Sequence, residues 1–231
     1  MTTLTPGLRL ERKLAFAYPA FGAVAAELWA SPRVAELYPE YLCTMHTIVR
    51  SSVPLMKAAL ERAWLLAPED EVAAGVAAYL ERHVHEEVGH DRWILEDLEA
   101  AGADPEEPLR RVPSRRVASV VGSQYYWLRH YHPVSLLGHV AVMEGFPPTS
   151  AFAERLQRDT GYPPEAFRAI SRHARLDIGH RRELYEAIDG LPLSPEHEDI
   201  LGLSGLHTIA GLIDVFEDIL ERTHASEVLA R

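Results

Sequence analysis

The stretch HARLDIGH at residues 173–180 has the same spacing of histidine and acidic residues as HVHEEVGH at residues 83–90. Each stretch begins with a histidine, has an acidic residue four positions later, and ends with a second histidine three positions after that. At 100° per residue these offsets fall within about 60° of one another, so each triad would project from one helix face. Two such faces packed together predict a cage of nitrogen and oxygen ligands. The six residues are His83, Glu87, His90, His173, Asp177 and His180.

The sequence around both triads predicts an all-α fold, a bundle of about seven helices. Apolar residues recur at three- and four-residue spacing, and little of the period-two alternation of strands is present. Gly102 and Pro147–Pro148 are expected to end the third and fifth helices. No linker or low-complexity tract divides the chain, which predicts one domain over residues 1–231. The expected helices are approximately residues 8–30, 40–66 with a kink at Pro54, 69–101, 114–131, 133–144, 163–188 and 195–223.

Composition restricts the partners and the metal ligands. The 231 residues carry a formal net charge of −11, which disfavours nucleic acid and anionic membranes and favours a small-molecule substrate. Cys43 is the single cysteine, so neither an internal disulfide nor a thiolate cluster can form, as is typical of a cytoplasmic protein. Any metal must be held by nitrogen and oxygen.

The N-terminal region has some features of a secretory signal, because basic residues precede the apolar residues 14–26. Glu11 lies among those basic residues, and Pro19 interrupts the apolar run. We therefore expect an amphipathic first helix.

Glu144 adds a third carboxylate to the candidate ligands. It lies in the apolar segment LLGHVAVMEG, residues 136–145, where a buried carboxylate is costly without a partner. A metal cation is such a partner, and iron in oxygen-activating sites prefers imidazole and carboxylate ligands on inward-facing helices. The charges of Glu87, Glu144 and Asp177 would offset most of the four positive charges of two ferrous ions.

Each of these residues also has a structural interpretation. A histidine on a helix face is usually a surface or hydrogen-bonded core residue, and acidic residues three or four positions away form ordinary helix pairs. The repetition of the triad, with His139 in the helix of Glu144, favours the metal site.

The motif of His173, Asp177 and His180 resembles that of the haem-oxygenase-like diiron oxidases and oxygenases, relatives of the thiaminase II and pyrroloquinoline quinone synthase folds. The resemblance covers approximately residues 42–216. Glu144 matches the lone carboxylate of that family, and His90 matches the histidine that closes its first helix motif. Many members have Glu at the position of His83.

Because His83 replaces the usual Glu, the carboxylate ligand from this helix would be either Glu86 or Glu87. Glu87 and His90 form the Glu-x2-His spacing of members that convert fatty acids to terminal alkenes. Glu86 lies further from the centre of the helix face, so Glu87 is the expected ligand. His83 would then be an additional ligand or would orient Glu87.

The resemblance implies a helical domain, commonly a homodimer, that binds two Fe(II) ions and uses dioxygen. Its members oxidise small amino acids, amines or fatty acids in specialised biosynthesis, and an external electron donor fits this chemistry. The segment VGSQYYWLRHYH, residues 121–132, resembles members that act on amino acids, which makes an amino acid or amine the first choice of substrate and a fatty acid the second. Gln124 and Trp127 share a helix face there and are candidate substrate contacts.

Two other functions compete with this one. A cofactor-independent enzyme of the thiaminase II or pyrroloquinoline quinone synthase type would use the same polar residues for acid–base chemistry. A non-enzymatic iron-binding bundle would hold iron without a substrate cavity, so an apolar cavity beside the ligands would count against it.

Overall fold

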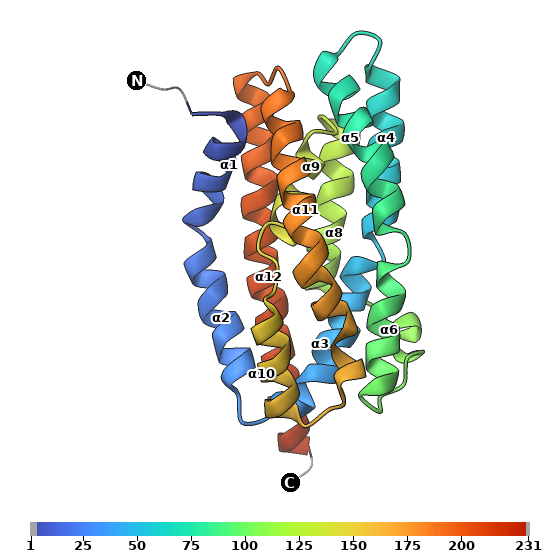
Figure 1. Cartoon of the computed structure of the whole chain (residues 1–231), viewed down its shortest axis with the longest axis vertical. Coiled ribbons are helices and arrows are strands. Elements are labelled where there is room, and N and C mark those ends of the chain that lie inside the picture. Colours follow the sequence, from blue (N-terminus) through green and yellow to red (C-terminus); the bar gives the residue numbers. More distant parts are fainter. Residues whose placement is uncertain (1–3, 230–231) are drawn as a thin grey trace.

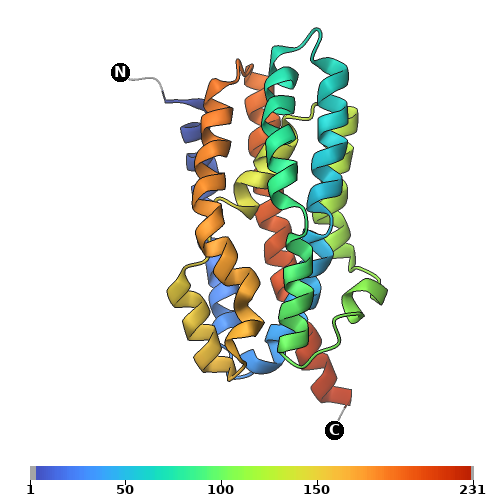
Figure 2. The same cartoon turned by 45° about the vertical axis from the view of Figure 1, so that its right-hand side comes forward.

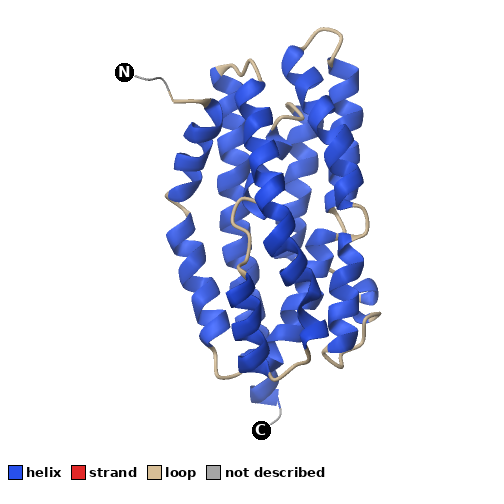
Figure 3. Ribbon diagram, viewed as in Figure 1, coloured by secondary structure: helices blue, strands red, loops and turns tan. Residues whose placement is uncertain are grey.

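The all-α class is confirmed by a computed structural model, which describes residues 4–229 and their side chains up to residue 222. No strand occurs within these residues, and the long helices run side by side (Figures 1 and 3). The helices are α1 Pro6–Ala15, α2 Tyr18–Ala30, α3 Val34–Val49, α4 Ser52–Leu66, α5 Glu71–Glu87, α6 His90–Ala100, α7 Glu107–Arg110, α8 Arg115–His130, α9 Ser135–Met143, α10 Ser150–Thr160, the 3-10 helix η1 Pro164–Phe167, α11 Arg168–Gly190 and α12 Pro195–Leu229.

Side-chain caps fix where several helices begin. The Asp70 carboxylate accepts a hydrogen bond from the amide of Ala73 at the start of α5, and Ser114 does the same for Val117 at the start of α8. These caps satisfy backbone donors that have no partner inside the helix. At the other end of α10, Gly161 adopts the left-handed conformation that often stops a helix.

Helix α12 is the central element of the bundle. It packs against α1, α2, α3, α8 and α9. Residues 195–222 are long and apolar enough to cross a membrane by length and composition, but 61% of an 18-residue apolar segment within them is buried inside the bundle. Close contact between α9 and α12 requires glycine, because a Cβ atom on Gly138 would lie 2.1 Å from the carbonyl oxygen of Leu201. This contact fixes α9, which carries Glu144 at its C-terminal end.

Three segments that we expected to be single helices are each divided in two. The first separates into α1 and α2, the second into α3 and α4 at Arg50–Ser51, and the third into α5 and α6 at Val88–Gly89. The predicted kink at Pro54 is wrong, because Pro54 lies in the first turn of α4, where the missing amide costs nothing. Figure 2 shows that the second and third breaks lie at the same level of the bundle.

Candidate metal centre

The seven predicted ligands converge at one place inside the bundle. They come from the end of α5, the start of α6, the end of α9 and the middle of α11, and α11 contacts the other three helices. Six of the seven residues are buried, and the His173 side chain is 23% exposed. Helices distant in sequence therefore supply one polar cluster within an apolar core.

The break between α5 and α6 determines how the first triad is presented. Helix α5 stops at Glu87, and Gly89 adopts a φ of 92°, a conformation that glycine reaches without strain. His90 then opens α6. Our assumption of one continuous helix face for this triad is therefore wrong, and a turn rather than helical periodicity brings His90 beside Glu87.

Short contacts connect the ligands. His83 Nε2 lies 2.8 Å from Glu144 Oε1, and His173 Nδ1 lies 3.0 Å from Asp177 Oδ1. His90 Nδ1 lies 3.1 Å from Glu87 Oε2.

Several buried atoms point at one another without forming hydrogen bonds. His180 Nδ1 lies 3.5 Å from Glu87 Oε1, 3.7 Å from Glu144 Oε2 and 3.8 Å from Asp177 Oδ1. The first two of these oxygens and the nitrogen have no hydrogen-bond partner. Each such atom costs about 1–3 kcal/mol when it is buried unsatisfied. A cation between them would satisfy all three, so these residues fit a metal ion.

Proton binding reflects the same excess of carboxylates. Burial acts to lower the pKa of His83, but the hydrogen bond and charge of Glu144, together with Glu87 and Glu86, raise it to about 9. Burial raises the pKa of Glu144. Burial would also raise the pKa of Glu87, but His90 and its neighbouring histidines lower it. Protons bound to the histidines thus offset the negative charge of the carboxylates, and a metal ion would displace these protons.

Glu86 lies further from the centre of the helix face than Glu87, as expected, but the sequence did not predict its contacts with two histidine rings. Its Oε2 atom lies 3.4 Å from His83 Nδ1 and 3.8 Å from His180 Nε2, on the outer side of both rings. Its side chain is 43% exposed. Glu86 lies in the last turn of α5, three positions after His83, and residues at that spacing lie on the same side of a helix.

A cavity of about 160 Å³ adjoins the cluster. Glu87, Glu144, His173 and Asp177 line one side of it. The rest is mostly apolar and includes Leu42, Met45, Ile94, Met143 and Ile170. Small-molecule sites commonly combine such apolar walls with a few polar groups.

Gln124 and Trp127 lie outside the lining of this cavity. Gln124 is fully buried, where its Oε1 atom accepts a hydrogen bond from Ser204 and its Nε2 atom lies 3.4 Å from Thr208 Oγ1. The Trp127 ring packs edge-on against His207. Their contact with substrate stays a prediction.

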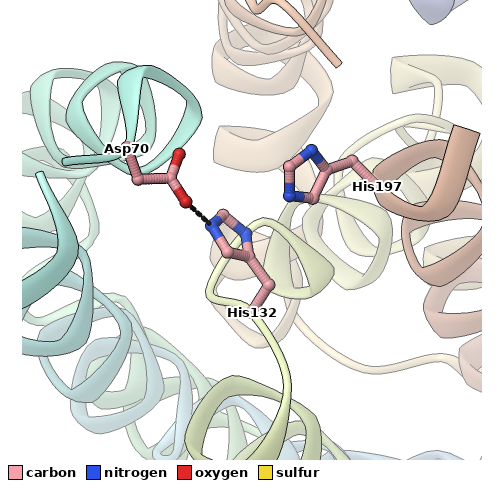
Figure 4. A group of neighbouring side chains, drawn as sticks. All are labelled: Asp70, His132 and His197. Atoms are coloured by element: carbon pink, nitrogen blue, oxygen red, sulfur yellow. Dashed lines mark hydrogen bonds and ion pairs between the residues drawn. The ribbon is translucent and has the colours of Figure 1, made fainter. Parts of the chain in front are cut away.

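Asp70, His132 and His197 form a second group of ligand-type side chains, at the start of α5, before α9 and at the start of α12 (Figure 4). His132 Nε2 lies 3.1 Å from Asp70 Oδ2. The backbone amide of Val134 donates to His132 Nδ1, so the ring proton is on Nε2 and is donated to Asp70. That arrangement uses the nitrogen that a metal would need. The hydrogen bond joins the start of α5 to the segment before α9, and the His197 ring packs against His132 with centroids 4.6 Å apart.

Comparison with known proteins gives a family and a fold. A model of a family of iron-containing redox enzymes matches residues 54–202, which include all seven candidate ligands. No protein of curated function matches the chain.

Three solved structures resemble the whole bundle. A domain of unknown function with a haem-oxygenase-like fold from Shewanella denitrificans has a TM-score of 0.81 at 16% identity, covering 95% of this chain and 94% of that one. A TenA homolog from Pseudomonas syringae pv. tomato has a TM-score of 0.66 at 13% identity, covering 91% and 92%. A CADD-like protein of unknown function from Nostoc punctiforme has a TM-score of 0.68 at 17% identity, covering 94% and 97%. At these identities the structures show the fold alone, and the predicted fold is confirmed.

Proposed function

The chain belongs to the family of iron-containing redox enzymes, and from that premise we propose that it uses two ferrous ions and dioxygen to oxidise a small organic molecule. The observation that carries the proposal is the group of buried, unsatisfied ligand atoms on Glu87, Glu144 and His180. The ligands would be His83, Glu87, His90, Glu144, His173, Asp177 and His180.

The arrangement of the histidines supports two ions rather than one. The rings of His83 and His180 are 5.1 Å apart and perpendicular, and the rings of His90 and His173 form a second pair with the same separation and orientation. The three carboxylates lie among these pairs, and seven side chains exceed the six positions of one octahedral ion. The four histidines would hold the ions, and the carboxylates of Glu87, Glu144 and Asp177 would supply the negative charge.

Bound ferrous ions would supply electrons and open coordination positions for dioxygen. The residues of this chain would hold the ions and control what reaches them. Carboxylates tolerate changes in ligand geometry, while Met143 and Ile170 form part of an apolar wall that limits water beside the ligands.

The cavity favours an enzyme over a storage protein, because storage of iron needs no apolar space beside the ligands. The cofactor-independent alternative is also less favoured. It requires a nucleophile such as Cys43, but that thiol lies outside the cavity lining and faces Glu107. Burial raises the pKa of the Cys43 thiol to about 12, which disfavours the reactive thiolate.

The test is anaerobic reconstitution with Fe(II), followed by metal analysis and mixing with oxygenated buffer. We expect close to two Fe(II) per chain and consumption of oxygen that an amino acid, amine or fatty acid accelerates. A variant in which His173 and Asp177 are both replaced by Ala should lose at least one of the two ions. Reconstituted protein that retains neither iron nor manganese would refute the proposal.

A further inference from the structure

A surface groove of about 460 Å³ lies where the α3–α4 and α5–α6 breaks meet. Figure 2 shows both breaks on the same side of the bundle. Three basic side chains, Arg50, Lys57 and Arg92, line the groove. They come from three different helical segments, so the fold rather than the local sequence gathers them.

These three cations are available to a ligand. None of them forms an ion pair within the described part of the chain, although Arg50 donates one hydrogen bond to the carbonyl of Pro108, at 3.4 Å. Lys57 and Arg92 are exposed. A basic groove is unexpected on a chain with a formal net charge of −11. Two carboxylates also line the groove, Glu87, which points at the metal centre, and Asp91, in the first turn of α6.

The groove adjoins the inner cavity, because Val49 and Glu87 line both spaces. A ligand that extends from one to the other would have its charged end among the cations and its apolar end beside the metal ligands. The inner cavity is similar in size to engineered cavities of about 150 Å³ that bind benzene, so it would hold a chain of about six carbon atoms.

We propose that the groove binds the carboxylate of the substrate, with Arg50, Lys57 and Arg92 as its partners. The substrate is then a monocarboxylic acid whose short apolar chain enters the cavity, and a simple amine is disfavoured because the three cations outnumber the two carboxylates of the groove, Glu87 and Asp91. Guanidinium groups suit this ligand, since they donate paired hydrogen bonds to carboxylates. This inference rests on the proposed function for its reaction, but the binding step is tested separately.

The experiment measures binding without oxygen, by calorimetry on Fe(II)-loaded protein. The probes are hexanoate, acetate, hexylamine and norleucine. We expect hexanoate to bind more tightly than acetate, because only hexanoate reaches the apolar cavity, and hexylamine to bind more weakly than either. Norleucine is hexanoate with an added α-amino group. A site built for amino acids would bind norleucine more tightly than hexanoate, and a site for simple carboxylic acids would not.

Three variants and one control identify the residues responsible. Arg50→Gln, Lys57→Gln and Arg92→Gln should each weaken hexanoate binding about tenfold, the loss of one charge-assisted contact. Arg158→Gln removes an exposed arginine of α10 that has no ion pair in the described residues, and it should leave binding unchanged. If Arg50→Gln does not fold, the Lys57→Gln and Arg92→Gln variants still test the inference. Hexylamine binding as tight as that of hexanoate, or hexanoate binding insensitive to all three variants, would overturn the inference. If the chain takes up no iron on reconstitution but the apoprotein binds hexanoate through these residues, only the proposed function is refuted.

Discussion

Glu86 lies where it can orient two of the proposed ligands at once. Its carboxylate is beside His83 Nδ1 and His180 Nε2, while the other nitrogen of each ring faces the buried carboxylates. A carboxylate that accepts the outer N–H of a ligating histidine fixes its tautomer and ring orientation. We therefore expect Glu86→Ala to weaken Co(II) binding about 10- to 100-fold, measured by absorbance titration. This is a larger effect than the sequence alone predicts.

Two further variants separate orientation from general charge. Glu86→Gln keeps an oxygen acceptor and should recover part of the affinity. Glu99→Ala removes an exposed carboxylate of α6 that lies outside the cluster and should bind Co(II) like the unmodified protein. Equal losses in Glu86→Ala and Glu99→Ala would mean that only net charge matters.

His180 has an unpartnered nitrogen that faces three carboxylates, so its replacement tests the metal centre directly. His180→Ala should abolish oxygen consumption by the iron-loaded protein. It should shift the apoprotein melting temperature by less than about 4 °C, because removing an unsatisfied buried group costs little stability. Far-UV circular dichroism checks the fold. Full turnover by this variant would show that α11 does not carry the site, and failure to fold would show that His180 is structural.

At the scale of elements, the turn between α5 and α6 controls the position of His90. Gly89 has a φ of 92°, where a Cβ atom is unfavourable even though it would meet no neighbour within 4 Å. Gly89→Ala should therefore cost about 1–2 kcal/mol of folding free energy and weaken Co(II) binding as the turn shifts. Urea denaturation and metal titration measure the two effects.

Gly102→Ala is the matched control, since Gly102 also has a positive φ, 77°, with no atom within 4 Å of the added Cβ. It lies after α6 and away from the ligands. We expect a similar loss of stability with unchanged metal affinity. If both variants bind Co(II) normally, the turn does not position His90.

The sequence predicted the identity of the clustered residues better than the shape of the elements that carry them. Histidine and carboxylate spacing was enough to select His173, Asp177 and His180, because α11 is continuous through them. The break at Gly89 was not predictable in this way. A glycine inside a helix costs only about 1 kcal/mol, so tertiary contacts decide whether the helix continues. The contact of Glu86 with His180 depends on how α11 packs against α5, and the groove depends on two breaks meeting.

At the scale of the whole molecule, one buried histidine makes the stability of the bundle depend on pH. Burial lowers the pKa of His139 to about 4, while its Nδ1 atom contacts Thr208 Oγ1 of α12 at 3.0 Å. The folded pKa is below the unfolded value of about 6.5, so the unfolded chain binds the proton first. The contribution of neutral His139 to the free energy of unfolding is therefore complete above pH 6.5. It is lost as the pH falls from 6.5 to 4, and the total loss is about 3 kcal/mol.

The measurement compares the apoprotein with His139→Asn by urea denaturation at pH 7.5, 6.0 and 4.5. The variant should be less stable at pH 7.5, and the difference should narrow by about 1.4 kcal/mol per pH unit below 6.5. Asp97 has the opposite effect on stability, because burial raises its pKa to about 6 and the folded state then gains stability as the pH falls. This effect is the same in both proteins, so it does not contribute to the difference between them. A difference that is constant across pH would contradict this account.

The close packing of α9 on α12 has a consequence for when iron can be captured during biosynthesis. Glu144 lies at the end of α9, and α9 is held by the contact of Gly138 with the backbone of Leu201 and Gly205. The whole ligand set precedes α12 in the chain, so every ligand leaves the ribosome before the helix that fixes Glu144 in place. A nascent chain therefore presents a loose set of proposed ligands, and selective iron loading must wait until α12 has been synthesised and has docked.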